Sequence, residues 1–151
     1  MSKLDVFDLV FVITAVAFNL LIAGIFIADK KQHPRLIRTL GMTWLLLAIP
    51  LAIVFVHYLL AGQELWIIVC FGGIFLYMLM ELLLDYVLKI EFRKKLSVHV
   101  PYIVLEYLVL LGLIGISFSV GKTWGYVVSI SFWVLMASLI YLYWSRKKKT
   151  A

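Results

Sequence analysis

Long uninterrupted runs of apolar residues divide the chain into five segments. Each run is about 20 residues long, which is the length at which an α-helix crosses the hydrocarbon core of a bilayer. The runs are apolar on every face, so they lack the alternating pattern of membrane β-barrel strands. The pattern predicts an all-α membrane protein, a bundle of five transmembrane helices that forms a single domain over residues 1–151. The predicted helices cover residues 6–28, 40–61, 65–88, 98–120 and 124–144.

Short segments between these runs predict two tight turns. Residues 59–65 join the second run to the third, and residues 121–123 join the fourth run to the fifth. Connections of this length place the joined helices side by side and antiparallel. Within the second run, Pro50 lacks a backbone N–H and is expected to kink its helix. Small residues are expected to allow close packing between helices at two places. These are Gly72 and Gly73 in the third run and Gly112, Gly115 and Ser119 in the fourth.

Composition supports the membrane interpretation. Of the 151 residues, 65% are hydrophobic and 15% are charged, and the mean hydropathy is +1.08. A water-soluble domain would be about half apolar and a quarter charged, so that class is excluded. The single cysteine, Cys70, cannot form an internal disulfide or a thiolate zinc site. The sequence contains none of the common nucleotide-binding, metalloprotease or hydrolase motifs, and no cofactor is predicted.

Clusters of basic residues predict the orientation in the membrane. The positive-inside rule places such clusters in the cytoplasm. The amino terminus is therefore predicted outside and the carboxyl terminus in the cytoplasm, with the cell membrane or, for a eukaryotic protein, the endoplasmic reticulum membrane as the location. Twelve of the fourteen basic residues follow the first, third and fifth runs: Lys30, Lys31, Arg35 and Arg38; Lys89, Arg93, Lys94 and Lys95; and Arg146, Lys147, Lys148 and Lys149.

The same clusters indicate which partners to expect. The formal net charge is +6, and attraction to anionic lipid headgroups, at about 1 kcal/mol per cation, accounts for it. A nucleic-acid partner is not expected, because no soluble domain remains outside the runs. A homodimer is a further prediction, because five helices cannot divide into two equal halves. Trp44 and Tyr86 are expected to anchor the cytoplasmic side of the bundle at the membrane interface.

Four of the polar residues inside the runs are informative, because a charged side chain at that depth costs about 2.5 to 3.5 kcal/mol on insertion scales. They are Asn19, Glu81, Asp85 and Glu106. Glu81 precedes Lys89 by eight residues and Glu106 follows Val98 by eight, so each glutamate is about 12 Å inside the cytoplasmic boundary. Because the third and fourth helices are antiparallel neighbours, the two glutamates are expected at one depth. Asn19 is expected near the same level.

Helical spacing arranges these residues in two polar stripes, because positions three or four apart share one face of a helix. We expect the stripes to face each other and to form an acidic pocket that opens toward the cytoplasm. The stripes consist of Tyr77, Glu81, Asp85 and Lys89 on the third helix and of His99, Tyr102 and Glu106 on the fourth. The expected order, from the innermost pair to the mouth, is Glu81 with Glu106, Asp85 with Tyr102, and Lys89 with His99.

Two carboxylates at one depth in a low-dielectric medium cannot both stay ionised without a partner. We therefore expect a proton or another cation between Glu81 and Glu106. A structural alternative remains open, because a protonated glutamic acid can donate a hydrogen bond to the other and clasp the two helices together.

The remaining polar residues also have structural alternatives to a role in ligand binding. Asn19 lies on a face of small residues, where a packing hydrogen bond is favoured over contact with a substrate. Asp85 is four residues from Lys89 and is favoured as its salt-bridge partner. His99 is interpreted as a solvated boundary residue or a titratable group at the mouth. His57 is interpreted as an isolated histidine at the outer interface.

Three classes of function fit this pattern. The first is a membrane protein whose acidic pocket binds or transports a proton, a cation, an amine or a lipid headgroup. The second is a scaffold or accessory subunit with no chemistry of its own. The third, an enzyme that modifies lipids, is disfavoured, because His99 and Glu106 are about 10 Å apart along one helix and cannot share a metal ion. The first class is the hypothesis that the sequence favours.

Overall fold

The computed structural model describes residues 5–89 and 96–149, the latter without the side chains of residues 96, 98 and 145–149. All of the described elements are helices. Five helical spans are long and apolar enough to cross a membrane, which confirms the predicted number and class of elements. These spans are Val6–Lys30, Pro34–Leu60, Leu65–Val87, His99–Val120 and Lys122–Trp144.

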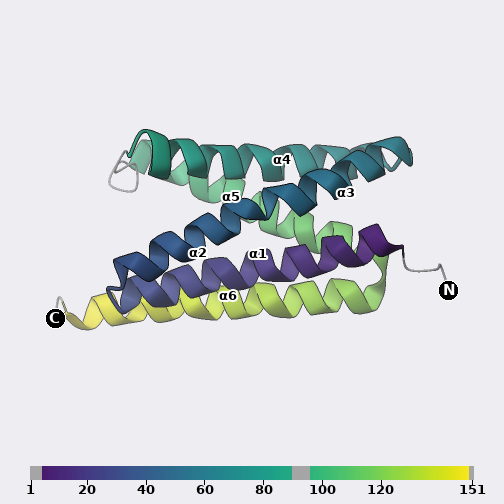
Figure 1. Ribbon diagram of the computed structural model, residues 1–151. Coiled ribbons are helices and arrows are strands. Elements are labelled where there is room, and N and C mark those ends of the chain that lie inside the picture. Colours follow the sequence, from purple (N-terminus) through teal and green to yellow (C-terminus); the bar gives the residue numbers. More distant parts are fainter. Residues whose placement is uncertain (1–4, 90–95, 150–151) are drawn as a thin grey trace.

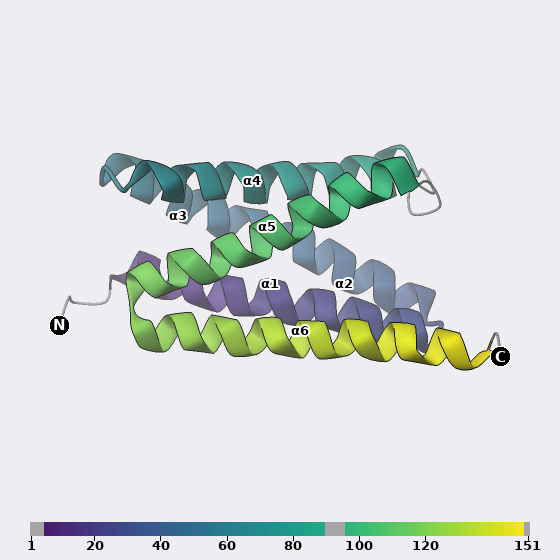
Figure 2. The same ribbon diagram turned by 180° about the vertical axis from the view of Figure 1, so that it is seen from behind.

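The helices form an elongated bundle in which two helices lie opposite a third. Helices α1 and α6 run side by side along one edge, and α4 runs along the opposite edge (Figure 1). The α2–α3 pair crosses between these edges on one face, and α5 crosses on the other face (Figure 2). The elements are α1 (Val6–Lys30), α2 (Pro34–Leu46), α3 (Ala48–Leu60), α4 (Leu65–Glu81), the π-helical segment η1 (Leu82–Val87), α5 (Leu96–Val120) and α6 (Lys122–Lys149).

Proline explains where the second span begins and where it is interrupted. Pro34 is the first residue of α2, a position where the missing N–H costs nothing because it has no helical acceptor. Pro50 cannot donate to the carbonyl of Leu46, and its ring clashes there. Accordingly α2 ends at Leu46, and the N–H of Leu47 donates to the carbonyl of Trp44 at 3.1 Å. The second span is therefore interrupted at Leu47, which is consistent with the kink predicted from Pro50, and it begins at Pro34 instead of residue 40.

Buried side chains of α1 form the centre of the hydrophobic core. Phe11 and Phe18 on α1, Phe71 on α4, Leu113 on α5 and Leu135 on α6 have no exposed surface. The rings of Phe11 and Phe71 have their centroids 5.6 Å apart. Buried aromatic side chains from opposite edges of the bundle therefore meet at its centre and hold its halves together.

Glycine permits close packing of α4 against α5 at one of the two predicted positions, Gly112. A Cβ atom at Gly112 would lie 3.3 Å from the Sγ of Cys70, so the absence of a side chain brings the two helices together. Among the described residues, no atom lies within 4 Å of a Cβ placed on Gly72 or Gly73. The expected close packing at Gly72 and Gly73 is therefore wrong.

Basic residues gather at one end of the bundle, where α1 ends, α2 begins and η1 ends (Figure 1). We call this the basic end, defined by Lys30, Lys31, Arg35, Arg38 and Lys89. The carboxyl-terminal end of α6 reaches the same end. Of the predicted clusters, Arg93, Lys94 and Lys95, and the side chains of residues 146–149, lie outside the described residues.

Candidate functional site

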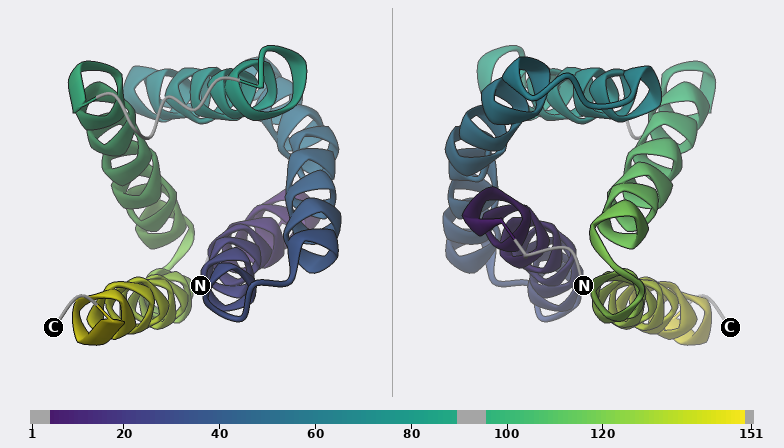
Figure 3. Two further views of the ribbon diagram at one scale, coloured as in Figure 1. Left: turned by 90° about the vertical axis from the view of Figure 1, so that its left-hand side faces the viewer. Right: turned by 90° about the vertical axis from the view of Figure 1, so that its right-hand side faces the viewer.

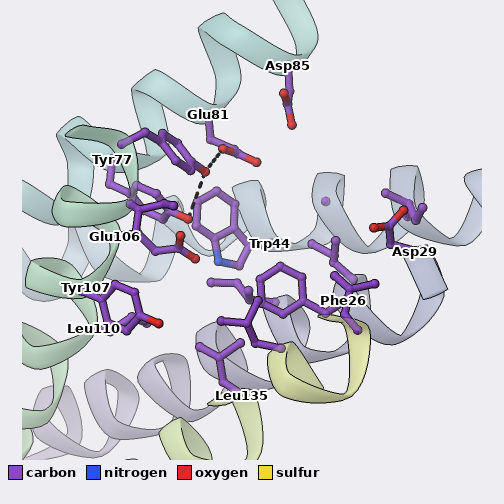
Figure 4. A pocket seen from close by; sticks show the side chains of 18 of the residues that line it. Phe26, Asp29, Trp44, Tyr77, Glu81, Asp85, Glu106, Tyr107, Leu110 and Leu135 are labelled. Atoms are coloured by element: carbon purple, nitrogen blue, oxygen red, sulfur yellow. Dashed lines mark hydrogen bonds between the residues drawn. The ribbon is translucent and has the colours of Figure 1, made fainter. Parts of the chain in front are cut away.

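A cavity of about 370 Å³ lies between the helices in the half of the bundle nearer the basic end (Figure 4). Side chains of α1, α2, α4, η1, α5 and α6 line it. Five of the six site residues predicted from the sequence are among them: Glu81, Asp85, His99, Tyr102 and Glu106. The structure thus brings the polar residues of the third and fourth spans to one cavity.

The wall formed by α4, η1 and α5 carries three carboxylates, those of Glu81, Asp85 and Glu106. Glu81 and Glu106 are half-buried, and Figure 4 shows both carboxylates directed into the cavity. The hydroxyl of Tyr102 donates a hydrogen bond to Glu81 and lies 3.2 Å from the hydroxyl of Tyr77. Tyr77 and Tyr102 are 3% and 5% exposed, so this hydrogen-bonded chain is shielded from solvent. It joins α4 to α5 at the depth of the two glutamates.

The opposite wall is mostly apolar. Apart from Asp29 of α1, it consists of aliphatic and aromatic side chains from α1 and α6, with a contact to α5 where the hydroxyl of Tyr107 lies 3.6 Å from the Sδ of Met136. Polar and apolar groups are therefore segregated across the cavity. The side chains of this wall are Ile22, Ile25, Phe26, Leu135, Met136, Leu139 and Leu142.

Trp44 lines the cavity from α2, a position that the sequence interpretation missed. The side chain is 2% exposed and packs against the rings of Phe18 and Tyr77, with centroids 4.9 and 5.6 Å away. Among the described residues, its indole Nε1 has no hydrogen-bond partner, and Figure 4 shows this nitrogen at the cavity surface. The interfacial anchoring predicted for Trp44 is wrong, because α2 begins at Pro34 and Trp44 therefore lies about 15 Å inside the span.

The π-helical segment changes the predicted stripe. In η1 the N–H of Leu88 donates to the carbonyl of Leu83 at 2.8 Å, five residues back. Glu81 and Asp85 still line the cavity, but Lys89 is not among the lining residues and has a φ of 49°. The predicted place of Lys89 at the mouth is therefore wrong, since the helix does not continue through it with a period of four.

The wider turn of η1 also directs Tyr86 into the cavity. The Tyr86 hydroxyl lies against Gly41 of α2, where a Cβ atom would be only 2.1 Å away. Glycine is therefore required at position 41 for this approach, because any side chain would displace Tyr86. Tyr86 lies near the end of its span, as predicted for an interfacial residue, and its ring also contributes to the cavity and contacts the opposing helix.

Asn19 lies outside the residues that line the cavity. It is completely buried, and its Nδ2 donates to the Oγ of Ser131 at 2.8 Å and lies 3.5 Å from the carbonyl of Val128. Both acceptors belong to α6. This contact is the packing hydrogen bond that we gave as the alternative for Asn19, and it fastens α1 to α6.

The other end of the bundle holds a second polar cluster. The Nε2 of His57 pairs with Asp5 at 3.0 Å, and its ring stacks on Phe7 with centroids 3.8 Å apart. The hydroxyl of Tyr58 donates to Asp8 at 2.7 Å. These contacts tie the start of α1 to the end of α3. The interpretation of His57 as an isolated histidine is wrong.

The chemistry of the cavity must be inferred from its own residues. Within residues 5–89 and 96–149, no group of three or more His, Cys, Asp or Glu side chains is arranged to hold a metal ion. No model of a known protein family, no curated protein and no solved structure matches the chain. The features that remain are a partly enclosed volume, two half-buried glutamates and several aromatic rings. Two buried nitrogens of lining residues, Trp44 Nε1 and His99 Nδ1, also have no hydrogen-bond partner among the described residues.

Proposed function

We propose that this chain is a membrane protein that binds a cation in the cavity between α4, α5 and α6. The observation that carries the proposal is the position of Glu81 and Glu106, two glutamates on antiparallel neighbouring helices that line one cavity inside the apolar spans. Binding is the minimal statement, and transport of the same cation would require the cavity to open in turn to each side of the membrane.

Electrostatics supports a cationic ligand. In a medium of low dielectric, two nearby carboxylates stabilise a positive charge between them far more strongly than in water. The alternative of leaving both glutamates charged and unneutralised is unfavourable at this depth. A proton, a metal cation or an organic ammonium group can supply the neutralising charge, and release of that cation would restore the repulsion.

The lining favours an organic ammonium ion over a metal ion. Faces of tryptophan and tyrosine attract organic cations, and Trp44, Tyr77 and Tyr102 are buried at the cavity beside the glutamates. Hard metal ions prefer a shell of several oxygen ligands, whereas most of the side chains here are apolar. The function proposed is therefore the binding of an amine.

We further propose that the basic end faces the cytoplasm and contacts anionic lipid headgroups. Lys30, Arg35 and Arg38 gather at that end of the described chain, and cytoplasmic leaflets attract such clusters. With this orientation the cavity lies in the inner half of the membrane.

A scaffold without a ligand is the second candidate, and one observation favours it. The hydrogen bond from Tyr102 to Glu81 joins α5 to α4, as a structural clasp between helices would. Interhelical hydrogen bonds of this kind contribute about 0.6 to 2 kcal/mol in membranes. A scaffold uses the glutamates only for stability, so the two candidates differ in whether a cation changes the protein.

The variants Glu81→Gln and Glu106→Gln, alone and together, separate these candidates. The purified chain in lipid nanodiscs is titrated with N-propyldodecylamine, and affinity and thermal stabilisation are recorded. The double variant should bind about a hundredfold more weakly, because one charge then lacks its counterpart. The matched control is Asp5→Asn with Asp8→Asn, which neutralises the carboxylates of the opposite end and should leave affinity unchanged. If the wild-type protein and all four variants bind the amine equally, and only thermal stability changes, the scaffold is established.

A further inference from the structure

The segregation of the cavity walls describes the shape of its ligand. Glu81, Asp85 and Glu106 occupy the side of α4, η1 and α5. The other side is formed mainly by aliphatic side chains of α1 and α6, with Asp29 near the end of α1 as its carboxylate. A small hydrophilic cation would leave that second wall in contact with water or empty space. A ligand with a charged head and an apolar body fits both walls, because burying each methylene against aliphatic side chains is favourable.

The buried donor of Trp44 adds a second requirement. A buried N–H without a partner costs free energy that a bound acceptor recovers, and native interiors rarely leave such a group unpaired. Trp44 is 2% exposed, lines the cavity and has no acceptor among the described residues. An ammonium group cannot fill this role, because it has only donors. The ligand must therefore carry an acceptor in addition to its positive charge.

An open edge of the cavity lies between α5 and α6. Three lining residues are exposed: Asp85 on η1, Tyr107 on α5 and Tyr143 on α6. The two tyrosines, which are 36% and 53% exposed, border the α5–α6 edge. The two helices meet at their turn and diverge toward the basic end (Figure 3). Both helices belong to spans that are apolar enough to face lipid. The exposed edge is thus a lateral opening in the wall of the bundle, suited to an apolar chain.

We propose that the ligand is an amphiphilic amine whose ammonium group lies by Glu81 and Glu106. A neighbouring hydroxyl, ether or carbonyl oxygen of the ligand accepts a hydrogen bond from Trp44 Nε1. Its apolar chain leaves the cavity between α5 and α6. This inference rests on the proposed function, because the ammonium group is the cation of that proposal. It adds an oxygen acceptor, an apolar chain and access from within the bilayer.

Three probes test the acceptor and the chain separately. N-dodecylethanolamine carries the amine, the oxygen and the chain; N-propyldodecylamine has the same size but lacks the oxygen; ethanolamine lacks the chain. In nanodiscs the wild-type protein should bind the first about tenfold more tightly than the second, the effect of one hydrogen bond to a buried donor. Ethanolamine should bind at least about a hundredfold more weakly than the first, since it buries no chain against the aliphatic wall.

The variant Trp44→Phe assigns the discrimination to the indole. It should bind N-dodecylethanolamine and N-propyldodecylamine equally, at the affinity that the wild-type protein shows for the latter. A measurement on the wild-type protein covers the case in which this variant does not fold. With ¹⁵N-labelled tryptophan, N-dodecylethanolamine should shift one indole N–H resonance downfield, and N-propyldodecylamine should not.

The outcomes distinguish this inference from the proposed function. Equal affinity of the wild-type protein for the two long-chain amines, with no indole shift, would overturn the acceptor while leaving an amine site that depends on Glu81 and Glu106. Ethanolamine binding as tightly as N-dodecylethanolamine would overturn the amphiphile and identify a ligand from solution. If none of the three amines binds, the proposed function itself fails.

Discussion

Two pairs of carboxylates lie at opposite ends of this bundle, and their surroundings differ. At the end of the bundle farther from the cavity, which we call the outer end, Asp5 pairs with His57 at 3.0 Å and Asp8 accepts a hydrogen bond from Tyr58 at 2.7 Å. Near the basic end, Glu81 and Glu106 line a cavity of about 370 Å³. Both pairs take part in contacts between helices, but the inner pair also borders space that a ligand can occupy. The cavity beside Glu81 and Glu106 is therefore the feature that distinguishes the candidate site from the carboxylates of the outer end.

Solvent explains why the contact between Asp5 and His57 contributes little to stability. The side chains of His57 and Asp5 are 33% and 48% exposed, so water and salt screen their charges and the pair contributes little. Glu81 and Glu106 are half-buried within apolar helices, where charge is poorly screened and a neutralising partner contributes strongly. Exposure to solvent thus distinguishes the contact between Asp5 and His57 from the candidate site at Glu81 and Glu106.

Filling the cavity is the change with the largest expected effect. Leu139 lies on the apolar wall, away from the carboxylates, and Leu139→Trp should lower the affinity for N-propyldodecylamine about a hundredfold by occupying the volume of its chain. The matched control is Leu60→Trp, at a position on α3 that is 84% exposed. Titration in nanodiscs measures both variants. Unchanged affinity in Leu139→Trp would show that amines bind elsewhere and would remove the distinction between the two ends.

The variant Tyr58→Phe should have the second largest effect, and only on stability. Tyr58 is 3% exposed and donates to the Asp8 carboxylate, and a hydrogen bond to a charged group contributes about 2 kcal/mol. The free energy of unfolding in a detergent titration should fall by that amount, and the affinity for amines should not change. A loss of amine binding in Tyr58→Phe would mean that the outer cluster also controls the site.

The sequence supports the bundle and much of the candidate site for clear physical reasons. Apolar runs of membrane length define the spans, and the equal depth of Glu81 and Glu106 on antiparallel neighbours places them at one cavity. Depth follows from the helical rise alone and so survives small errors in helix boundaries. This is why the carboxylates were found while details of the helices around them were not.

The residues that sequence analysis misplaced depend on local departures from a regular helix. Trp44 was assigned to the interface because its helix begins six residues before the apolar run, at Pro34 instead of residue 40. Lys89 was assigned to the mouth because a regular period of four ignores the π-helical turn before it. Such turns depend on tertiary packing, here the approach of Tyr86 to Gly41, which a hydrophobicity pattern does not contain. Pro34 was the available signal for the earlier start, since proline favours the first position of a helix.

The smallest expected effect belongs to the ion pair at the outer end. Asp5→Asn removes the charge opposite His57 and should lower the free energy of unfolding by only about 0.5 kcal/mol, because both side chains are partly exposed. Raising the salt concentration should reduce even this difference, since screening weakens exposed pairs. Detergent titrations of the wild-type protein and the variant at two ionic strengths measure both quantities. A decrease in the free energy of unfolding of more than about 2 kcal/mol that persists at high salt would mean that Asp5 and His57 are shielded from solvent. Solvent exposure would then no longer account for the contrast with Glu81 and Glu106.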